Sequence, residues 1–329
     1  MSRSMQTLKN QTSEEFLNSV SSELDALEHV RLDKLAAYNA RKVMGKMAAI
    51  IGCPVTLLID FFMFFGRGDD NAAGLTILFL GGLYYWVRGP VREYIKAYKK
   101  RIMPRIARTL GDLSYDPDGK LLVKGRKGTK IVPRYNRNQV EDYFTGTYKG
   151  TSIEISEMTL RYKSGSGKNS STRTVFKGLG LLIDVPKKFY GHTIMLPNQS
   201  GVVEWFKEKT TGLERANLVS PQFENKYDVY TNDQVEARYL IHPNVIEKFS
   251  ALAQRYKGKG GIRAAYYQSQ LLLLVPSDEN HFEPADIEIP AASPESVLAM
   301  RDDLLKVLDI VDELELIDEK QMELDKQVA

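Results

Sequence analysis

The sequence predicts a mixed α+β protein, in which a two-helix transmembrane hairpin precedes an α+β domain and a helical arm lies at each end. Three observations lead to this fold class. Residues 47–66 carry one charge in twenty positions, and residues 72–87 form a second apolar run. From about 135 to 290, strand-like and helix-like patterns alternate without a regular β-α-β repeat. The 329 residues are 43% hydrophobic and 26% charged, a composition that excludes disordered and fibrous classes.

Residues 1–45 are expected to form an N-terminal cytoplasmic helical arm. Phe16, Val20, Leu24 and Leu27 recur at helical spacing with polar residues between them. This apolar stripe has two open interpretations: it packs against the rest of its own chain, or it contacts a partner or a second copy.

Residues 46–90 are expected to form the transmembrane hairpin, with spans at 47–66 and 72–87. A helix rises about 1.5 Å per residue, so the first span is roughly 30 Å long and matches a bilayer core. The second run has only sixteen residues. We expect small residues to let the two helices approach closely, namely Ala73, Gly74, Gly81 and Gly82.

The charges that flank the apolar runs predict an orientation. Residues 31–46 contain five Lys or Arg against Asp33, and residues 88–108 contain eight against Glu93. The positive-inside rule therefore places both termini in the cytoplasm of a bacterial inner membrane. Residues 91–134 form a basic juxtamembrane segment, which we expect to bind anionic lipid headgroups. Nucleic acid is the less favoured partner because no recognition motif accompanies these charges.

The α+β domain is expected at residues 135–290. Strands are predicted at 147–163 and 173–185, on either side of the polar linker SGSGKNSST. Helices are predicted at 202–211 and 243–257. Shorter strands are predicted near 192–196, 215–219, 222–230 and 262–275, the last with a turn near Gln268.

Residues 291–329 are expected to form an acidic C-terminal helix. Its apolar residues step by three and four, which is typical of a coiled-coil seam and suggests a homo-oligomer; they are Val297, Met300, Leu304, Val307, Val311 and Leu314.

Catalytic and ligand motifs are absent from the sequence. SGSGKNSS lacks the glycine spacing of a phosphate loop, and Asp116-Pro-Asp-Gly119 is a turn instead of a calcium loop. HExxH, CxxC, GxSxG and GxGxxG do not occur. We therefore predict no enzyme activity, no cofactor and no metal site.

Two candidate sites follow from the residues. Asp60 is an ionisable group within an apolar span, where it either lines an ion pathway or, as we favour, bonds to the neighbouring helix or reaches the membrane surface. The second site lies in residues 232–239. Asn232 is expected to cap a short helix that carries Asp233, Glu236 and Arg238. A buried ion pair that fixes the packing is favoured there over a ligand or partner site.

Three segments resemble a bacterial membrane family that is catalogued only as domain of unknown function three-one-three-seven. They are FTGTYKGTSIEISEMTLRY (144–162), TVFKGLGLLIDVPKKFYG (174–191) and SPQFENKYDVYTNDQVEARYLIHP (220–243). The resemblance covers about residues 45–285, including two spans before the folded domain. It implies a LemA-type membrane protein as a partner and supplies no catalytic residues.

These features together predict a membrane-anchored scaffold or sensor that binds a protein partner or ligand. One alternative is an oligomeric pore or transport subunit with Asp60 in the membrane. A second is an enzyme with an unrecognised site near Asp233, Glu236 and Arg238.

Overall fold

A computed structural model describes residues 14–67, 74–167, 170–186, 188–198, 212–216, 223, 225–256 and 258–314. The chain divides into two compact units. The first comprises Met1–Ile102 and Glu283–Ala299, and the second comprises Met103–Phe282 and Met300–Ala329. Among our predicted elements, the helix at 202–211 and the tail at 315–329 lie outside the described residues.

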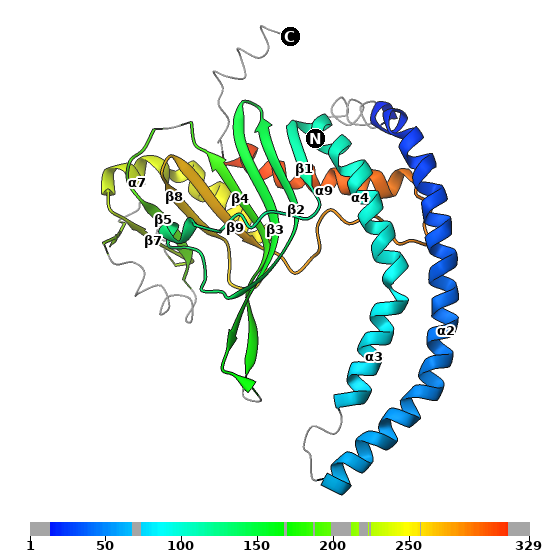
Figure 1. The fold of residues 1–329 in the computed structure, drawn as a ribbon. Helices are drawn as coiled ribbons and strands as arrows, with labels where there is room; N and C mark the ends of the chain where they lie inside the picture. The colour runs from blue at the N-terminus through cyan, green and yellow to red at the C-terminus, as the bar shows by residue number, and fades with distance from the viewer. Residues whose placement is uncertain are drawn as a thin grey trace. The chain divides into compact units, whose positions relative to one another are not determined.

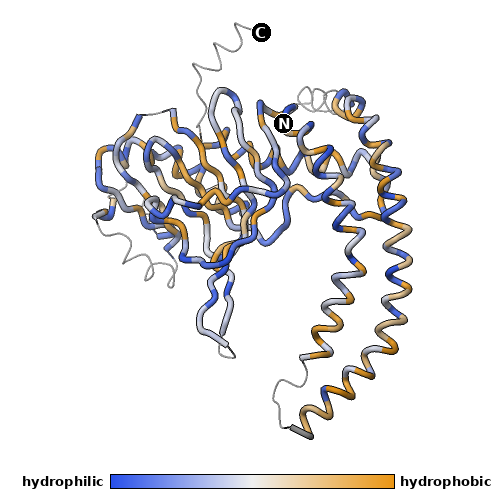
Figure 2. Tube along the Cα trace, in the orientation of Figure 1, coloured by the Kyte–Doolittle hydropathy of each residue, from blue (hydrophilic) through white to orange (hydrophobic). Residues whose placement is uncertain are grey.

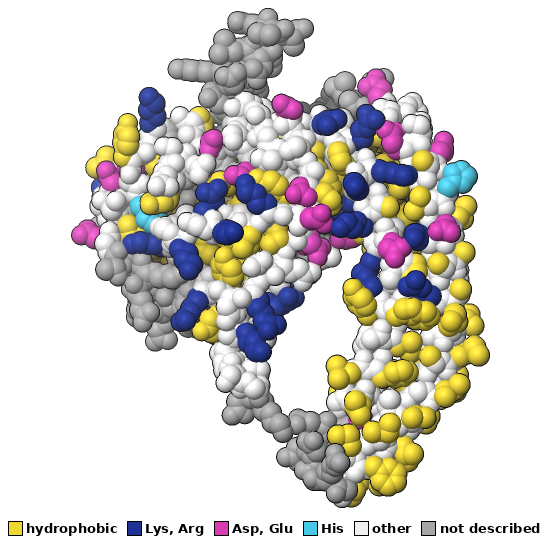
Figure 3. Space-filling model, in the orientation of Figure 1, with side chains coloured by type: hydrophobic (Ala, Val, Ile, Leu, Met, Phe, Trp, Pro, Cys, Tyr) yellow, Lys and Arg dark blue, Asp and Glu magenta, His cyan; other side chains and the backbone are white. Residues whose placement is uncertain are grey.

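The first unit is dominated by α2 (Ser21–Arg67), a helix of 47 residues. The N-terminal arm and the first apolar run, which we expected as separate elements, form this one continuous helix (Figure 1). The half of α2 toward Arg67 and the whole of α3 (Gly74–Val87) are apolar (Figure 2), and most of their side chains are exposed (Figure 3). Within the described residues, α2 is the helix whose length and composition suffice to cross a membrane, whereas α3 is shorter.

The arm packs within the chain. Phe16, Val20, Leu24 and Leu27 are at most 4% exposed, so the apolar stripe is covered by the protein itself. Arg31 is also buried, and its guanidinium donates to the Ile287 carbonyl and pairs with Glu28. Glu28 in turn accepts from the backbone N–H of Ala291 at 2.7 Å. The hydrogen bond from Arg31 lowers the pKa of Glu28.

The contact between α2 and α3 is made by glycines that we did not predict. A Cβ atom added at Gly45 would lie 2.7 Å from Val87, and one added at Gly52 would lie 2.3 Å from the Phe79 ring. Our expectation for the glycines of α3 was wrong, because a Cβ atom at Gly74, Gly81 or Gly82 would meet nothing within 4 Å. Ala73, named with them, lies outside the described residues. Side chains of α3 thus enter gaps on α2, and the α3 glycines face outward.

This packing predicts that two similar substitutions differ in their effect on the free energy of unfolding. Gly52→Val would force Phe79 out of its place, and overpacking of this kind costs about 1–3 kcal/mol. Gly81→Val would enter open space. We expect denaturant titration of the full chain in mixed micelles to show a clear loss of stability for Gly52→Val only. Equal effects of the two variants would contradict this packing.

The second unit is built on a nine-stranded antiparallel sheet, counted over the described residues, with the order β1-β2-β3-β4-β9-β8-β5-β7-β6. The strands are β1 (Asp112–Asp116), β2 (Arg137–Tyr148), β3 (Thr151–Ser164), β4 (Ser171–Asp184), β5 (Thr193–Pro197), β6 (Glu214–Arg215), β7 (Tyr227–Thr231), β8 (Arg263–Tyr267) and β9 (Gln270–Pro276). The mixed α+β class is therefore confirmed.

Most predicted strands appear in the sheet, with two revisions. β2 was not predicted as a separate strand; the chain turns at Lys149 and Gly150, both with positive φ, before β3 begins. β1 lies in the segment that we expected to be only juxtamembrane. The predicted hairpin at 262–275 is confirmed, because β8 and β9 pair around a turn in which Gln268 and Ser269 both have positive φ.

Both faces of the central strands are covered. Every residue from Leu179 to Ile183 on β4, and from Leu271 to Val275 on β9, is buried. Successive side chains of a strand point to opposite faces, so such runs require cover on each side. On one face, Leu122, Val123, Ile131 and Val132 of the segment after β1 complete an apolar core.

Two longer helices accompany this sheet. They are α8 (Pro243–Arg255) and α9 (Pro294–Glu313), of which the part from Met300 belongs to this unit. The predicted stripe of α8 is buried, as are all six residues of the seam predicted on α9. The seam is thus covered within the chain, which removes the reason for expecting a coiled coil with a second copy.

Candidate functional site

The segment singled out in the sequence at 232–239 forms the junction between β7 and the short helix α7 (Gln234–Leu240). Asp233 is the residue that caps this helix: its carboxylate accepts from the N–H groups of Val235 and Glu236, each at 2.9 Å. We expected Asn232 in that role. The Asn232 amide oxygen accepts instead from the backbone N–H of His192 at 2.7 Å, which ties the start of β5 to this junction.

Glu236 holds the loop that precedes β5. Its two carboxylate oxygens accept from the backbone N–H groups of Tyr190 and Gly191, at 2.8 and 2.6 Å. Hydrogen bonds to an ionised acceptor are about twice as strong as neutral ones. A Cβ atom at position 191 would lie 2.5 Å from Glu236 Oε1, so a larger residue there would displace the carboxylate from its place. Glu236 therefore fixes the loop against α7.

Arg238 does not join the two carboxylates. Its side chain is exposed, and its Nε donates to the Gln234 carbonyl one turn earlier at 3.0 Å. Within the described residues it forms no ion pair with Asp233 or Glu236. The buried ion pair that we expected is thus absent, because the backbone N–H groups of α7 and of the loop occupy the carboxylates.

Asp233 and Glu236 thus hold α7 and the loop before β5 in place, and we call these two segments the frame. The frame carries an exposed surface. We call it the α7 surface and define it as Tyr190, Val235, Arg238 and Tyr239. Tyr190 is 93% exposed, Val235 76% and Tyr239 55%. Positions 235, 238 and 239 are three and four residues apart, so they share one face of the helix. Tyrosine and arginine are enriched at the energetic centres of protein interfaces, which gives this surface the composition of a docking site.

Asp60 lies in the other unit, within the apolar half of α2. Its Oδ2 accepts from both the backbone N–H and the hydroxyl of Thr76, at 3.0 and 2.7 Å. Thr76 is in the first turn of α3, where backbone N–H groups have no partner within the helix. The Thr76 hydroxyl also lies 3.1 Å from that of Thr56. Asp60 therefore caps α3 from the neighbouring helix.

A pocket of about 350 Å³ in the second unit contains a hydroxyl next to a histidine, which our sequence analysis missed. His281 Nε2 lies 2.9 Å from Ser277 Oγ, and both residues are 8% exposed. The Ser277 hydroxyl also accepts from the N–H of Glu279 at 3.2 Å. In the described residues no hydrogen bond orients the other ring nitrogen of His281. The pair thus closes a loop and lacks the third group of a catalytic triad.

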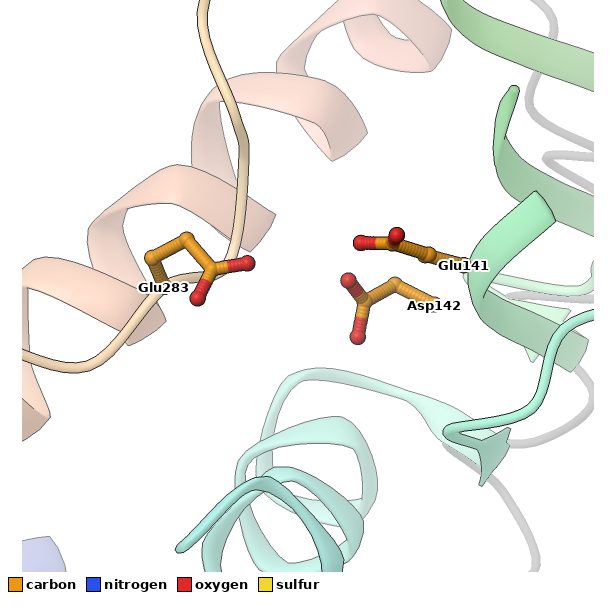
Figure 4. A group of neighbouring side chains, drawn as sticks. All are labelled: Glu141, Asp142 and Glu283. Atoms are coloured by element: carbon orange, nitrogen blue, oxygen red, sulfur yellow. The ribbon is translucent and has the colours of Figure 1, made fainter. Parts of the chain in front are cut away.

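Figure 4 draws the carboxylates of Glu141 and Asp142 on β2, together with Glu283. Asp142 accepts from the Tyr115 hydroxyl at 2.5 Å. Within its own unit, Glu283 pairs with Lys99 at 2.6 Å. Because Asp142 and Glu283 already have protein donors, we assign no metal to them.

The roles of the α7 residues predict different costs for two substitutions on one helix. Asp233→Ala removes the cap and should destabilise the domain by about 1 kcal/mol. Arg238→Ala removes an exposed side chain and should change stability by less than about 0.5 kcal/mol. Chemical denaturation of the full chain in detergent, followed by circular dichroism, checks both values. A loss on Arg238→Ala as large as that on Asp233→Ala would contradict the assignment.

His192, next to this junction, predicts a dependence of stability on pH. Burial lowers the pKa of His192, whose Nε2 lies 3.1 Å from the Thr129 carbonyl. The unfolded chain therefore takes up the proton first, and stability that is present above about pH 6.5 is lost as the pH falls. We expect His192→Gln to reduce the loss of stability between pH 7.5 and 5, whereas His29→Gln, at an exposed position, should leave it unchanged.

The fold and these contacts define an α+β protein with a long, exposed apolar helix. Residues 174–316 match the model of a family described as "Protein of unknown function (DUF3137)". The match covers β4 to β9 and α7 to α9, and it supports the family resemblance of this part of the chain. No curated protein matches. A solved structure, the mycobacterial trehalose monomycolate transport factor A, TtfA, is 10% identical and covers 64% of this chain and 94% of its own, with a TM-score of 0.32. At that TM-score the likeness carries no argument.

Proposed function

We propose that this protein is a membrane-anchored interaction protein whose α+β domain binds a protein partner through the α7 surface. The observation that carries the proposal is the exposure of Tyr190, Val235 and Tyr239 on a frame held by Asp233 and Glu236. A surface that is already ordered loses less conformational freedom on binding than a flexible one.

The apolar half of α2 supports the membrane anchor. Soluble monomers seldom expose apolar patches above a few hundred Å², yet both α2 and α3 expose large side chains along their length, among them Ile50, Phe62, Phe65, Ile77 and Leu78. In the proposal α2 and α3 both cross a bacterial inner membrane as a hairpin. Both termini then face the cytoplasm, in agreement with the positive-inside rule applied to the flanking charges.

Cations and aromatic rings at one end of the pair support the same arrangement. Arg92 lies 3.7 Å from the centre of the Tyr85 ring, and Arg41 lies 5.2 Å from that of Trp86. Arg41 also donates to the Trp86 carbonyl at 2.9 Å. Aromatic residues together with arginine are typical of the interface between membrane and water.

We do not extend the proposal to a pore, because the Asp60 carboxylate bonds to Thr76 at the start of α3. Nor do we extend it to an enzyme: near α7, Asp233 and Glu236 accept from backbone N–H groups and Arg238 faces solvent. The LemA-type membrane protein that the resemblance implies is the first partner to test.

Purification of the tagged full chain from native membranes in mild detergent tests the proposal. We expect a LemA-type protein to co-purify in stoichiometric amount. The double variant Tyr190→Ala/Tyr239→Ala should retain at least tenfold less of it, since each side chain is a candidate anchor of the interface. Ile289→Ala, an exposed apolar position outside the α7 surface, is the matched control and should retain it.

Two outcomes would contradict the proposal. One is the absence of a stoichiometric partner across several mild detergents. The other is a partner that is retained equally by the double variant and the control, which would place the interface elsewhere.

A further inference from the structure

The end of the β3–β4 hairpin extends beyond its neighbouring strands as a two-stranded arm. β9 pairs with β4 only from Gly178 onward, and β2 begins at Arg137, opposite Arg161 of β3. From Lys163, which pairs with Thr172, no other strand of the described residues pairs with the arm on either side (Figure 1). A two-stranded ribbon alone is marginally stable in water.

Cationic side chains cover this arm on both faces. The basic arm is defined here by Arg161, Lys163 and Arg173 of the hairpin together with Arg134 and Arg137, which come just before β2 and at its first residue. Side chains directly opposite each other in an antiparallel pair share a face, so Arg137, Arg161 and Lys163 lie on one face. On the other face, Arg134 and Arg173 lie 5.2 and 5.9 Å from the centre of the Tyr162 ring. Figure 3 shows dark blue side chains gathered where the arm leaves the sheet.

In the part of the chain that the structure describes, ion pairs do not offset these charges. Residues 126–140 and 159–177 contain ten Lys or Arg and no Asp or Glu. Among the described residues, none of the five cations of the basic arm forms an ion pair. Arg137 and Arg161 are directly opposite each other across the strands. Like charges in that position repel, and an anionic surface would relieve the repulsion.

We propose that the basic arm binds the anionic headgroups of the membrane in which the protein is anchored. This inference rests on the proposed function, because a membrane anchor holds the domain at a high effective concentration near the bilayer. Weak electrostatic attractions are then sufficient for the arm to bind the surface. A nucleic acid is the less suitable occupant. The aromatic ring of the arm, Tyr162, is flanked by Arg134 and Arg173, so it offers no open platform on which bases could stack.

The test uses the full chain in vesicles and two separate fluorescent labels. One label is placed on the native Cys53 of α2, and acyl-chain quenchers report whether that helix is inserted. The other is placed on Ser166→Cys at the exposed end of the arm, in a Cys53→Ala background, and headgroup quenchers report whether the arm touches the surface. Vesicles of phosphatidylcholine are compared with vesicles that also contain phosphatidylglycerol. Failure of the anchor and failure of the arm are thereby distinguished.

We expect the Cys53 label to be quenched in both vesicle types and the arm label only in the anionic one. Salt at 0.5 M should remove the quenching of the arm, because it shortens the range of electrostatic attraction. The triple variant Arg161→Gln/Lys163→Gln/Arg173→Gln should shift the binding equilibrium about a hundredfold toward the free arm. Each cation near an anionic surface contributes about 1 kcal/mol to binding. Lys188→Gln/Lys226→Gln/Lys259→Gln, at exposed positions outside the arm, changes the net charge equally and should leave the quenching intact.

Three results would overturn the inference. The first is an arm label that is quenched equally in neutral and anionic vesicles, or in neither. The second is equal loss of quenching in the two triple variants. The third is a larger response of the arm label to single-stranded RNA in neutral vesicles than to anionic lipid, which would assign the arm to nucleic acid.

Discussion

The exposed apolar half of α2 is the constraint on which the first unit depends. In the proposed membrane hairpin, a helix in hydrocarbon must leave no backbone group without a partner, and the first turn of α3 is where N–H groups lack a partner within the helix. Asp60 supplies such a partner, because its carboxylate accepts from the N–H and the hydroxyl of Thr76. A charged residue in an apolar run is thus explained by the helix beside it. Gly45 and Gly52 serve the same contact by letting α3 side chains approach.

The second unit shows a related use of carboxylates. Asp233 and Glu236 each accept from two backbone N–H groups, one pair at the start of α7 and the other in the loop before β5. Both carboxylates are occupied by main-chain donors, and the neighbouring side chains of the α7 surface are apolar, aromatic or cationic. These two carboxylates therefore order the loop and the helix that carry the α7 surface.

The sequence predicted what depends on periodicity and missed what depends on distant pairing. The stripe Val245, Ile246, Phe249 and Leu252 specified α8, and strand-like composition specified β3, β4, β8 and β9. β2 was missed because its pairing with β3 includes a bulge at Asp142. The bulge interrupts the alternation of buried and exposed residues by which a strand is recognised in a sequence. Asn232 and Asp233 are equivalent as caps by residue type. The fold distinguishes them, because the Asn232 amide accepts from the His192 N–H next to β5, whereas the Asp233 carboxylate reaches the first N–H groups of α7.

The same reasoning explains why the glycines of the helical pair were misjudged. Glycine composition identifies positions that permit close approach, whereas the rotation of each helix decides which positions are used. Gly45 and Gly52 are seven residues apart and so recur on one face of α2, toward Val87 and Phe79. Gly81 and Gly82 are adjacent and belong to the outward side of α3. Spacing alone does not identify the contact, because Gly74 and Gly81 of α3 are also seven residues apart and meet nothing within 4 Å. The contact is identified by the α3 side chains Val87 and Phe79, which lie against Gly45 and Gly52.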